Sequence, residues 1–294
     1  MSYVKNYNAG SIKLDAPYTH FIYELPMLSF GDIQHNVNLS LIYLSKATDD
    51  SYNIAIGYKL NLQKRAIKSA GTGYLTDFEE GNGDRIKLIR CGTTGSDVYL
   101  FDDKSKRIIR KTSTGFTLEN SDYSKEIYDD HGNILKIIDK YGNAVFTYEY
   151  VTDTTRLDRI IYRENLKTSD GTYKRVLKLS YTTENKLSDI KYIFDGVEQC
   201  KFDFVYNGSE LTTIKSPSGV NYTITKNSEL FSVCSHDDDA TYSATINHYQ
   251  KIACQHPLFG TITVENFIGE KVVDRTIYHP MALISDDKCE VWDI

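Results

Sequence analysis

The stretch Tyr128 to Asn143, YDDHGNILKIIDKYGN, decides the fold of this chain. It combines a tyrosine, a segment rich in Asp, Gly and Asn, and an aliphatic pair formed by Ile134 and Ile137. Asp, Gly and Asn are typical of tight turns, whereas Tyr and Ile favour strands. The stretch therefore predicts a strand, a turn and a second strand.

The same arrangement recurs along the chain. Leu/Ile-x-x-Ile pairs begin at residues 134, 157, 187 and 211, in steps of 23, 30 and 24 residues, and an aromatic residue precedes each pair. One hairpin cannot bury its own apolar face, but hairpins laid side by side form a continuous antiparallel sheet that curls as it twists. The predicted repeat core consists of Tyr128, Ile134, Ile137, Leu157, Ile160, Tyr181, Leu187, Ile190, Tyr206, Leu211 and Ile214.

The composition also favours an all-β fold. The chain has 294 residues, with 23 Tyr, 12 Phe and 1 Trp but only 5 Pro, and such aromatic residues suit pleated, half-buried surfaces. Its formal net charge is −6, from 34 basic and 40 acidic residues, so a nucleic-acid partner is not expected. No cofactor is expected either.

We expect three segments along the chain. Residues 1–98 form an N-terminal β-module, because residues 37–43 and 54–62 alternate between apolar and polar side chains around a polar turn. Residues 99–250 form a YD-repeat-like array of antiparallel β-hairpins. Residues 251–294 form a C-terminal β segment and tail.

Neither a membrane span nor a secretion signal is expected. No stretch approaches 18 apolar residues, and residues 1–17 contain no apolar run of signal-peptide length. The five cysteines are odd in number and lack C-x-x-C spacing, which favours reduced thiols. We expect synthesis in the cytoplasm, with any export by a non-classical or specialised route.

Residues 128–143 resemble the YD repeat, the unit that names the Rhs/YD-repeat family. The family pattern is Tyr-Asp-x-x-Gly-Asn/Arg-Leu-x-x-Ile-x-Asp-x-x-Gly, and this stretch departs from it only by Ile134 in place of leucine. Residues 206–219 resemble it with one residue deleted, and residues 181–190 keep its tyrosine and aliphatic pair. Over residues 28–233, the resemblance implies a spiralling sheet of hairpins, which in long family members closes into a hollow shell around a toxin or other cargo. About five units are too few to close such a shell.

The clearest candidate metal site in the sequence consists of two Cys-x-His pairs, Cys234 with His236 and Cys254 with His256. Residues i and i+2 of a strand share a face, so two neighbouring strands could bring together a tetrahedral zinc site. The spacing matches no common zinc module, so the favoured interpretation is core thiols and surface histidines, without a metal. The run from His236 to Asp239 offers oxygen ligands for calcium, but it lacks the spacing of a calcium loop.

Other polar residues have simpler interpretations. Asp102, Asp103, Asp129 and Asp130 occupy expected turns, although a pair of acids for glycoside hydrolysis remains open. The sequence has no Gly-x-Ser-x-Gly motif. The basic run 104–111 would contact an anionic glycan or a partner, or else protect a sheet edge from aggregation.

The leading functional prediction is a non-enzymatic structural or interaction module, similar to the shell segments of YD-repeat proteins, in a toxin-delivery or cell-surface assembly. The main alternative is a glycan-binding module that uses exposed Tyr rings, and the third is a glycoside hydrolase with a carboxylate pair. A row of exposed Tyr rings would favour glycan binding, whereas a scaffold would bury them.

We also expect the chain to dock against another chain or another copy of itself. An open array of hairpins has two ends with unpaired backbone groups. Trp292, the single tryptophan, lies two residues before the last residue, and tryptophan is enriched at binding hot spots. It therefore either folds back onto the last hairpin or contacts a partner.

Overall fold

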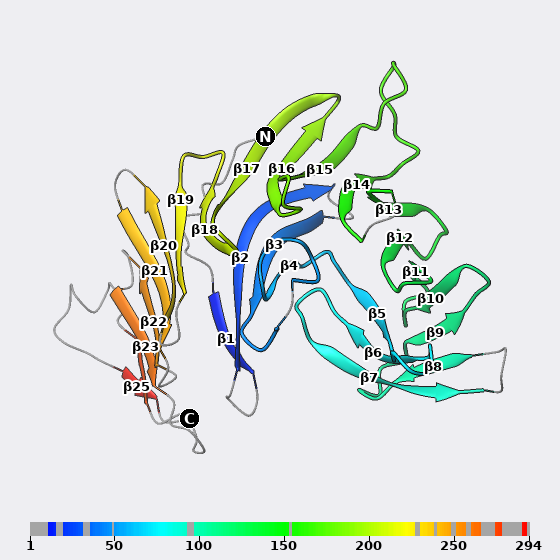
Figure 1. The fold of residues 1–294 in the computed structure, drawn as a ribbon, viewed down its shortest axis with the longest axis horizontal. Coiled ribbons are helices and arrows are strands. Elements are labelled where there is room, and N and C mark those ends of the chain that lie inside the picture. Colours follow the sequence, from blue (N-terminus) through cyan, green and yellow to red (C-terminus); the bar gives the residue numbers. More distant parts are fainter. Residues whose placement is uncertain are drawn as a thin grey trace. The chain divides into compact units, whose positions relative to one another are not determined.

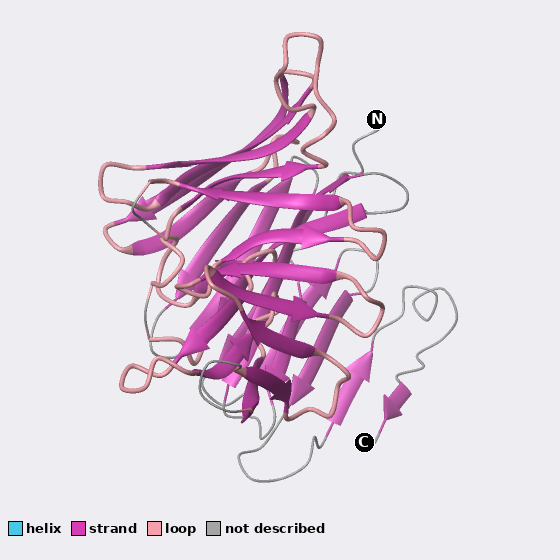
Figure 2. Ribbon diagram, turned by 90° about the vertical axis from the view of Figure 1, so that its right-hand side faces the viewer, coloured by secondary structure: helices cyan, strands magenta, loops and turns pink. Residues whose placement is uncertain are grey.

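The computed structural model contains strands and connecting loops, and no helix among the residues that it describes (Figures 1 and 2). Those residues are 11–15, 20–31, 36–48, 50–92, 97–152, 155–226, 230–237, 240–247, 251–256, 260–265, 274–277 and 290–292. The all-β class and its construction from antiparallel hairpins are therefore confirmed. This part of the chain contains no helix long and apolar enough to cross a membrane.

The strands follow one another along the chain with short connections. The first four belong to a small N-terminal sheet and are β1 (Ser11–Asp15), β2 (His20–Gly31), β3 (Asn36–Leu44) and β4 (Tyr58–Leu60). The next twelve are β5 (Arg65–Lys68), β6 (Leu75–Glu79), β7 (Arg85–Cys91), β8 (Val98–Phe101), β9 (Ile108–Lys111), β10 (Gly115–Glu119), β11 (Lys125–Asp129), β12 (Ile134–Ile138), β13 (Ala144–Tyr150), β14 (Leu157–Tyr162), β15 (Arg175–Tyr181) and β16 (Leu187–Phe194). The remaining strands are β17 (Val197–Asn207), β18 (Glu210–Lys215), β19 (Asn221–Lys226), β20 (Leu230–Asp237), β21 (Ala240–Asn247), β22 (Lys251–His256), β23 (Gly260–Glu265), β24 (Asp274–Ile277) and β25 (Glu290–Trp292).

The chain divides into two compact units that interleave along the sequence. The first unit comprises Met1–Met27, Ser40–Tyr58 and Phe202–Ile294, and the second comprises Leu28–Leu39 and Lys59–Lys201. This division differs from the expected boundaries at residues 98 and 250. A sequence pattern groups neighbours along the chain, whereas the units are defined by contacts between distant segments.

Each strand from β5 to β16 pairs antiparallel with the next strand in the chain. The strands from β17 to β25 pair in the same consecutive manner. Consecutive pairing requires only local turns, and this explains why turn-forming residues recur so regularly. Strand β9 pairs with both β8 and β10, so the basic run does not protect a sheet edge.

A β-bulge recurs at the Leu/Ile-x-x-Ile pairs. In β13–β14, Tyr150 opposes Leu157 and Glu149 opposes Arg159, so Asp158 is an extra residue without a direct partner. Positions three apart on a regular strand face opposite sides, but the extra residue resets the alternation. Both Leu157 and the following isoleucine, Ile160, are consequently fully buried. The same register shift occurs in the pairs β5–β6, β11–β12, β15–β16 and β17–β18.

The hairpin β5–β6 is a copy of this unit that the sequence analysis did not detect. Lys68 stands where the other units have tyrosine, and the aliphatic pair is replaced by Leu75 and Phe78. Both of these side chains are buried. Because these residue types differ from the repeat pattern, the sequence assigns this hairpin to the expected N-terminal module.

The repeated turns share one backbone geometry. In the hairpin Asp129–Asn133, the N–H of Asp129 donates to the oxygen of Asn133, and Gly132, the fourth turn residue, donates to Asp129. Gly132 has a φ of 85°, as a three-residue hairpin loop with a glycine bulge requires. The same pair of hydrogen bonds closes the turns 80–84, 120–124, 139–143, 168–172, 182–186 and 216–220.

Most of the predicted repeat core is buried. Fully buried members are Tyr128, Ile134, Leu157, Ile160, Leu187, Ile190, Leu211 and Ile214. Tyr181, Tyr206 and Ile137 are only partly buried. For Ile137 this corrects the expectation of a core position. Its cross-strand neighbours are Glu126 on β11 and Phe146 on β13, and a second register shift follows it at Ile138, so only one of the two neighbours offers an apolar side chain.

Contacts of residues 28–31 show why this early segment belongs to the second unit. The ring of Phe30 packs edge-on against Phe146, with 5.5 Å between ring centroids, and lies 6.2 Å from Tyr192. Arg175 donates a hydrogen bond of 2.6 Å to the backbone oxygen of Gly31. The end of β2 thus packs on hairpins that lie more than a hundred residues further along the chain.

Candidate functional site

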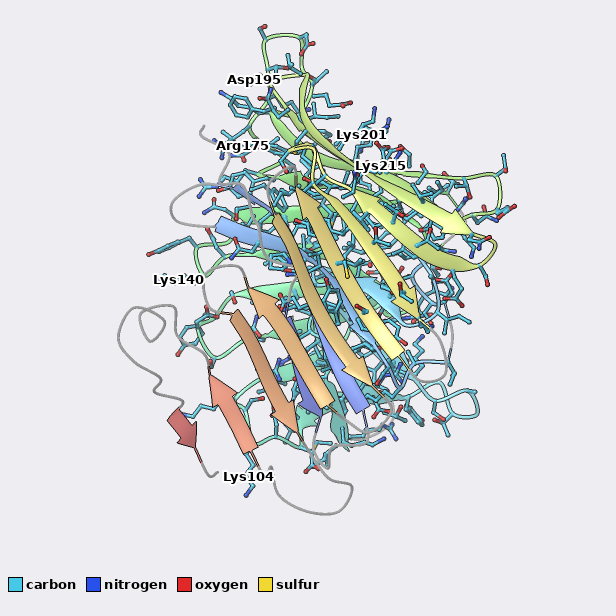
Figure 3. All side chains as sticks on the ribbon, turned by 90° about the vertical axis from the view of Figure 1, so that its left-hand side faces the viewer. Lys104, Lys140, Arg175, Asp195, Lys201 and Lys215 are labelled. Atoms are coloured by element: carbon cyan, nitrogen blue, oxygen red, sulfur yellow. The ribbon has the colours of Figure 1, made fainter. Side chains whose placement is uncertain are left out.

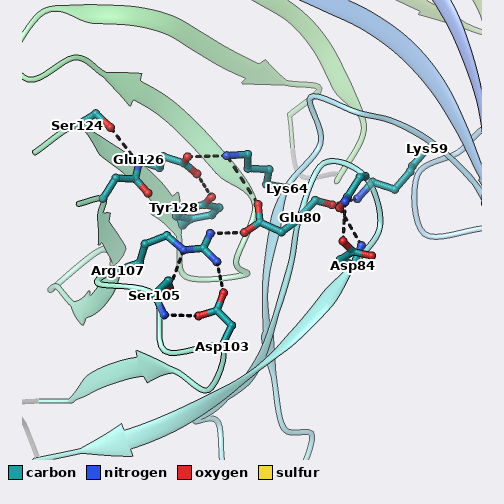
Figure 4. Close-up of polar contacts among 12 residues, drawn as sticks. Lys59, Lys64, Glu80, Asp84, Asp103, Ser105, Arg107, Ser124, Glu126 and Tyr128 are labelled. Atoms are coloured by element: carbon teal, nitrogen blue, oxygen red, sulfur yellow. Dashed lines mark hydrogen bonds and ion pairs between the residues drawn. The ribbon is translucent and has the colours of Figure 1, made fainter. Parts of the chain in front are cut away.

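The second unit contains a cluster of charged side chains from β4, β6, β7 and β11 and from the loops next to these strands (Figure 4). Its members are Lys59, Lys64, Glu79, Glu80, Arg85, Asp103, Arg107, Glu126 and Tyr128. Four cations and four carboxylates balance in charge. We call this cluster the ion network.

Lys59 and Glu79 form its most deeply buried pair. The Lys59 ammonium lies 2.7 Å from Glu79 Oε1 and also donates to the backbone oxygen of Glu80 at 2.8 Å. Both side chains are almost fully buried, and this burial lowers the pKa of Lys59. Arg85 binds the second oxygen of Glu79 at 3.1 Å, so the carboxylate is shared by two cations.

Arg107 anchors the loop between β8 and β9. Its guanidinium donates to Glu80 and, at 3.0 Å, to Asp103 Oδ2, while its Nε donates to the hydroxyl of Ser105. The same guanidinium lies over the ring of Phe101, 4.0 Å from its centroid. These contacts hold the loop against the carboxylate of Glu80, which follows the last residue of β6.

Glu126 connects Tyr128 to Lys64. The Tyr128 hydroxyl donates to Glu126 Oε2, and the Lys64 ammonium lies 2.6 Å from Glu126 Oε1. Burial raises the pKa of Tyr128, and the negative charge of Glu126 raises it further. Tyr128, the tyrosine of the best-matching repeat, is therefore a hydrogen-bond donor at neutral pH.

In the ion network every carboxylate contacts a cation. General acid–base chemistry needs a carboxyl group that exchanges protons with a substrate, whereas these groups already accept hydrogen bonds from basic side chains. Such buried, balanced networks orient the strands that carry them. No sequence motif marks the ion network, because its residues are scattered over 70 positions.

The weak zinc candidates, which the sequence interpretation did not favour as ligands, are not aligned by the sheet register. Cys234 shares its cross-strand row with Ser243 and Gln255, whereas Cys254, the neighbour of Gln255, lies in the next row. Adjacent rows alternate between the two faces of a sheet. The two Cys-x-His pairs thus occupy rows of opposite faces, separated by β21. Cys234 itself is a partly buried free thiol.

Several residues singled out from the sequence have side chains that the structure does not describe. Of His236, Cys254, His256 and Trp292, the structure gives only the strand positions, in β20, β22 and β25. Asp238 and Asp239 of the calcium candidate are not described. In the remaining part of the chain, no group of three or more His, Cys, Asp or Glu residues could hold a metal ion.

Of the four aspartates expected in turns, Asp103 and Asp129 accept hydrogen bonds from residues of their own turns, whereas Asp130 binds a lysine of β5. Asp129 accepts hydrogen bonds from the backbone and side chain of Asn133, at 2.8 and 2.9 Å. Asp130 binds Lys68 at 2.9 Å, which lowers the pKa of this carboxyl group. Asp103 binds the backbone N–H of Ser105 as well as Arg107.

Most tyrosines with described side chains are buried or partly buried. Among those whose side chains are described, only Tyr123 and Tyr141 are exposed, at 75% and 78%.

Comparison with known proteins adds no family, because no protein-family model and no curated protein matches the chain. The resemblance to the YD repeat therefore rests on the residues quoted above.

Proposed function

We propose that this protein is a non-enzymatic structural and interaction module, built from repeated hairpins. The observation that carries the proposal is the burial of the repeat tyrosines within the hairpin array. Of the repeat tyrosines, Tyr128 is fully buried and Tyr181 and Tyr206 are partly buried, and none of them is exposed. A scaffold uses these rings for cohesion between hairpins, whereas a long glycan-binding surface would expose them.

The polar cluster supports the same interpretation. The carboxylates of the ion network bind cations of the same network, so they serve the fold rather than a substrate. The setting implied by the YD-repeat resemblance, a toxin-delivery or cell-surface assembly, is part of the proposal. It is supported by the repeated bulge and turn at the residues that carry the resemblance.

An apolar pair on β7 and β8 supports the interaction part of the proposal. Ile89 and Leu100 lie directly opposite each other across the two strands, and both are exposed. Ile108 continues this cross-strand row on β9 and is partly buried. Branched apolar side chains in one row of a sheet face form a surface that a second protein chain can cover.

Light scattering over a concentration series tests the proposal, with the chain alone and with the product of the adjacent gene. We expect association in at least one of the two, and we expect Ile89→Lys to weaken it by tenfold or more. Val197→Lys is the matched control, because it adds the same charge at an exposed position outside this row. A strict monomer that binds nothing in both experiments would contradict the proposal.

A further inference from the structure

The two exposed tyrosines lie on loops at the same end of the second unit. Consecutive antiparallel hairpins alternate their turns between the two ends of a sheet. The turns of β10–β11 and β12–β13 therefore share one end, as does the loop between β8 and β9. Tyr123 belongs to the first of these turns and Tyr141 to the second.

The backbone at Tyr123 points to a role outside folding. Tyr123 has a φ of 68°, in the left-handed region that L-residues with a Cβ avoid. It is the fourth residue of its turn, and the six equivalent turns have Gly83, Gly132, Gly142, Gly171, Asn185 and Gly219 there. A tyrosine here is unfavourable for the backbone, and its exposed ring recovers little of this energy through packing. The ring is therefore better explained by a contact with another molecule.

The turns that carry Tyr123 and Tyr141 are neighbours at this end of the sheet. Their loops are separated by two strand spacings, about 10 Å, roughly the length of a disaccharide. Hydrogen bonds from Ser124 lower the pKa of Asp122, and the positive charge of Lys140 makes the smallest contribution to this shift. Lys140 also lies 5.1 Å from the ring centroid of Tyr141. Figure 3 shows Lys104 and Lys140 extending away from the ribbon.

The charges of these loops favour an uncharged ligand. Segments 102–107, 120–124 and 139–143 together carry four acidic and four basic residues, Asp102, Asp103, Asp122, Asp139, Lys104, Lys106, Arg107 and Lys140. A nucleic acid would require a basic surface. The C–H faces of a neutral pyranose pack on aromatic rings, while its hydroxyl groups hydrogen-bond to surrounding polar side chains.

We propose that Tyr123 and Tyr141 form a contact site for a neutral, pyranose-containing glycan. The site is short, with two rings on adjacent hairpin turns, and it is separate from the apolar row of Ile89 and Leu100. The proposal does not rest on the scaffold function, because a scaffold module needs no exposed tyrosine at a glycine position.

Titration of the full chain with neutral hexasaccharides of glucose, N-acetylglucosamine, mannose and xylose, followed by calorimetry and NMR, tests the proposal. We expect one series to bind, and we expect Tyr123→Gly to weaken this binding at least tenfold. Because glycine suits the φ of this position, the thermal midpoint of Tyr123→Gly should not fall. Tyr141→Ala should weaken binding similarly, whereas Lys104→Ala, in the third loop, should leave it unchanged.

Three outcomes would overturn the proposal. The first is that none of the four probes binds. The second is binding that survives both tyrosine substitutions. The third is that Tyr123→Gly abolishes capture of a protein partner in the scattering experiment while no glycan binds, which would assign the two rings to a protein interface.

Discussion

The hydroxyl of Tyr181 donates a hydrogen bond of 2.7 Å to the backbone oxygen of Leu157. Tyr150 makes the equivalent bond, at 2.9 Å, to the oxygen of Ile134. In each case the tyrosine of one bulged hairpin reaches the first aliphatic residue of the preceding one. Burial raises the pKa of both hydroxyl groups, so they are donors throughout the physiological range. The repeat tyrosine thus links successive units.

Removing one of these hydroxyl groups should weaken the array measurably. Tyr181→Phe keeps the ring but leaves the Leu157 oxygen without this donor, which should lower the free energy of unfolding by about 1 kcal/mol. Tyr141→Phe, at an exposed position, should have no effect. Urea denaturation followed by fluorescence measures both variants, and equal stabilities would refute a linking role for the hydroxyl.

Two glycines with the same φ should differ sharply when replaced by alanine. A Cβ on Gly132 would lie 1.8 Å from the backbone oxygen of Ala66, whereas a Cβ on Gly142 would meet nothing within 4 Å. Gly142→Ala should therefore cost about 1 kcal/mol, from backbone strain alone. Gly132→Ala must also separate β5 from the turn that follows β11, and thermal unfolding should show a clearly larger loss. Similar losses would mean that Ala66 and Gly132 are not in contact in solution.

The second residue of the aliphatic pair should contribute different amounts to stability in different repeats. Ile160→Ala creates a cavity at a fully buried site and should cost about 2–5 kcal/mol. Ile137→Ala should cost less, because Ile137 is only partly buried. Chemical denaturation of the two variants provides the comparison, and an equal or larger loss for Ile137 would contradict the described packing.

The buried pair of the ion network should respond asymmetrically to mutation. Lys59→Met removes one cation from a buried carboxylate, and such a change typically costs about 3–5 kcal/mol. The double variant Lys59→Met/Glu79→Leu should recover part of this loss, although it leaves Arg85 without its partner. Thermal unfolding of the single and double variants tests the coupling. Additive losses would show that the two side chains do not interact.

Stability should fall at alkaline pH through the buried tyrosines. Burial, with a smaller contribution from Glu210, raises the pKa of Tyr43 to about 12. Unfolded tyrosine ionises near pH 10, so the folded state then binds the proton more tightly. The contribution of Tyr43 is complete below pH 10 and is lost as the pH rises from about 10 to 12. Tyr43→Phe should flatten this part of the pH profile, measured by urea midpoints, and an unchanged profile would exclude the mechanism.

The sequence by itself determined the strands, the turns and the order of pairing. Residues such as Asp129 and Gly132 specify their turn locally, because side-chain hydrogen bonds and a positive φ depend on neighbouring residues alone. Such short turns bring each strand beside the next strand in the chain. The spacing of Leu157 and Ile160 also predicts a repeat. It does not predict the bulge that places both residues on one face of the sheet.

Only the tertiary structure decided which distant residues meet. Phe30 packs on Phe146, and Lys59 binds Glu79, yet neither contact leaves a periodic signal because each joins segments through space. The partial exposure of Ile137 likewise depends on a polar cross-strand neighbour, Glu126, which repeat spacing does not reveal. Local patterns fix backbone geometry, whereas burial and charge pairing depend on the packing of the whole unit.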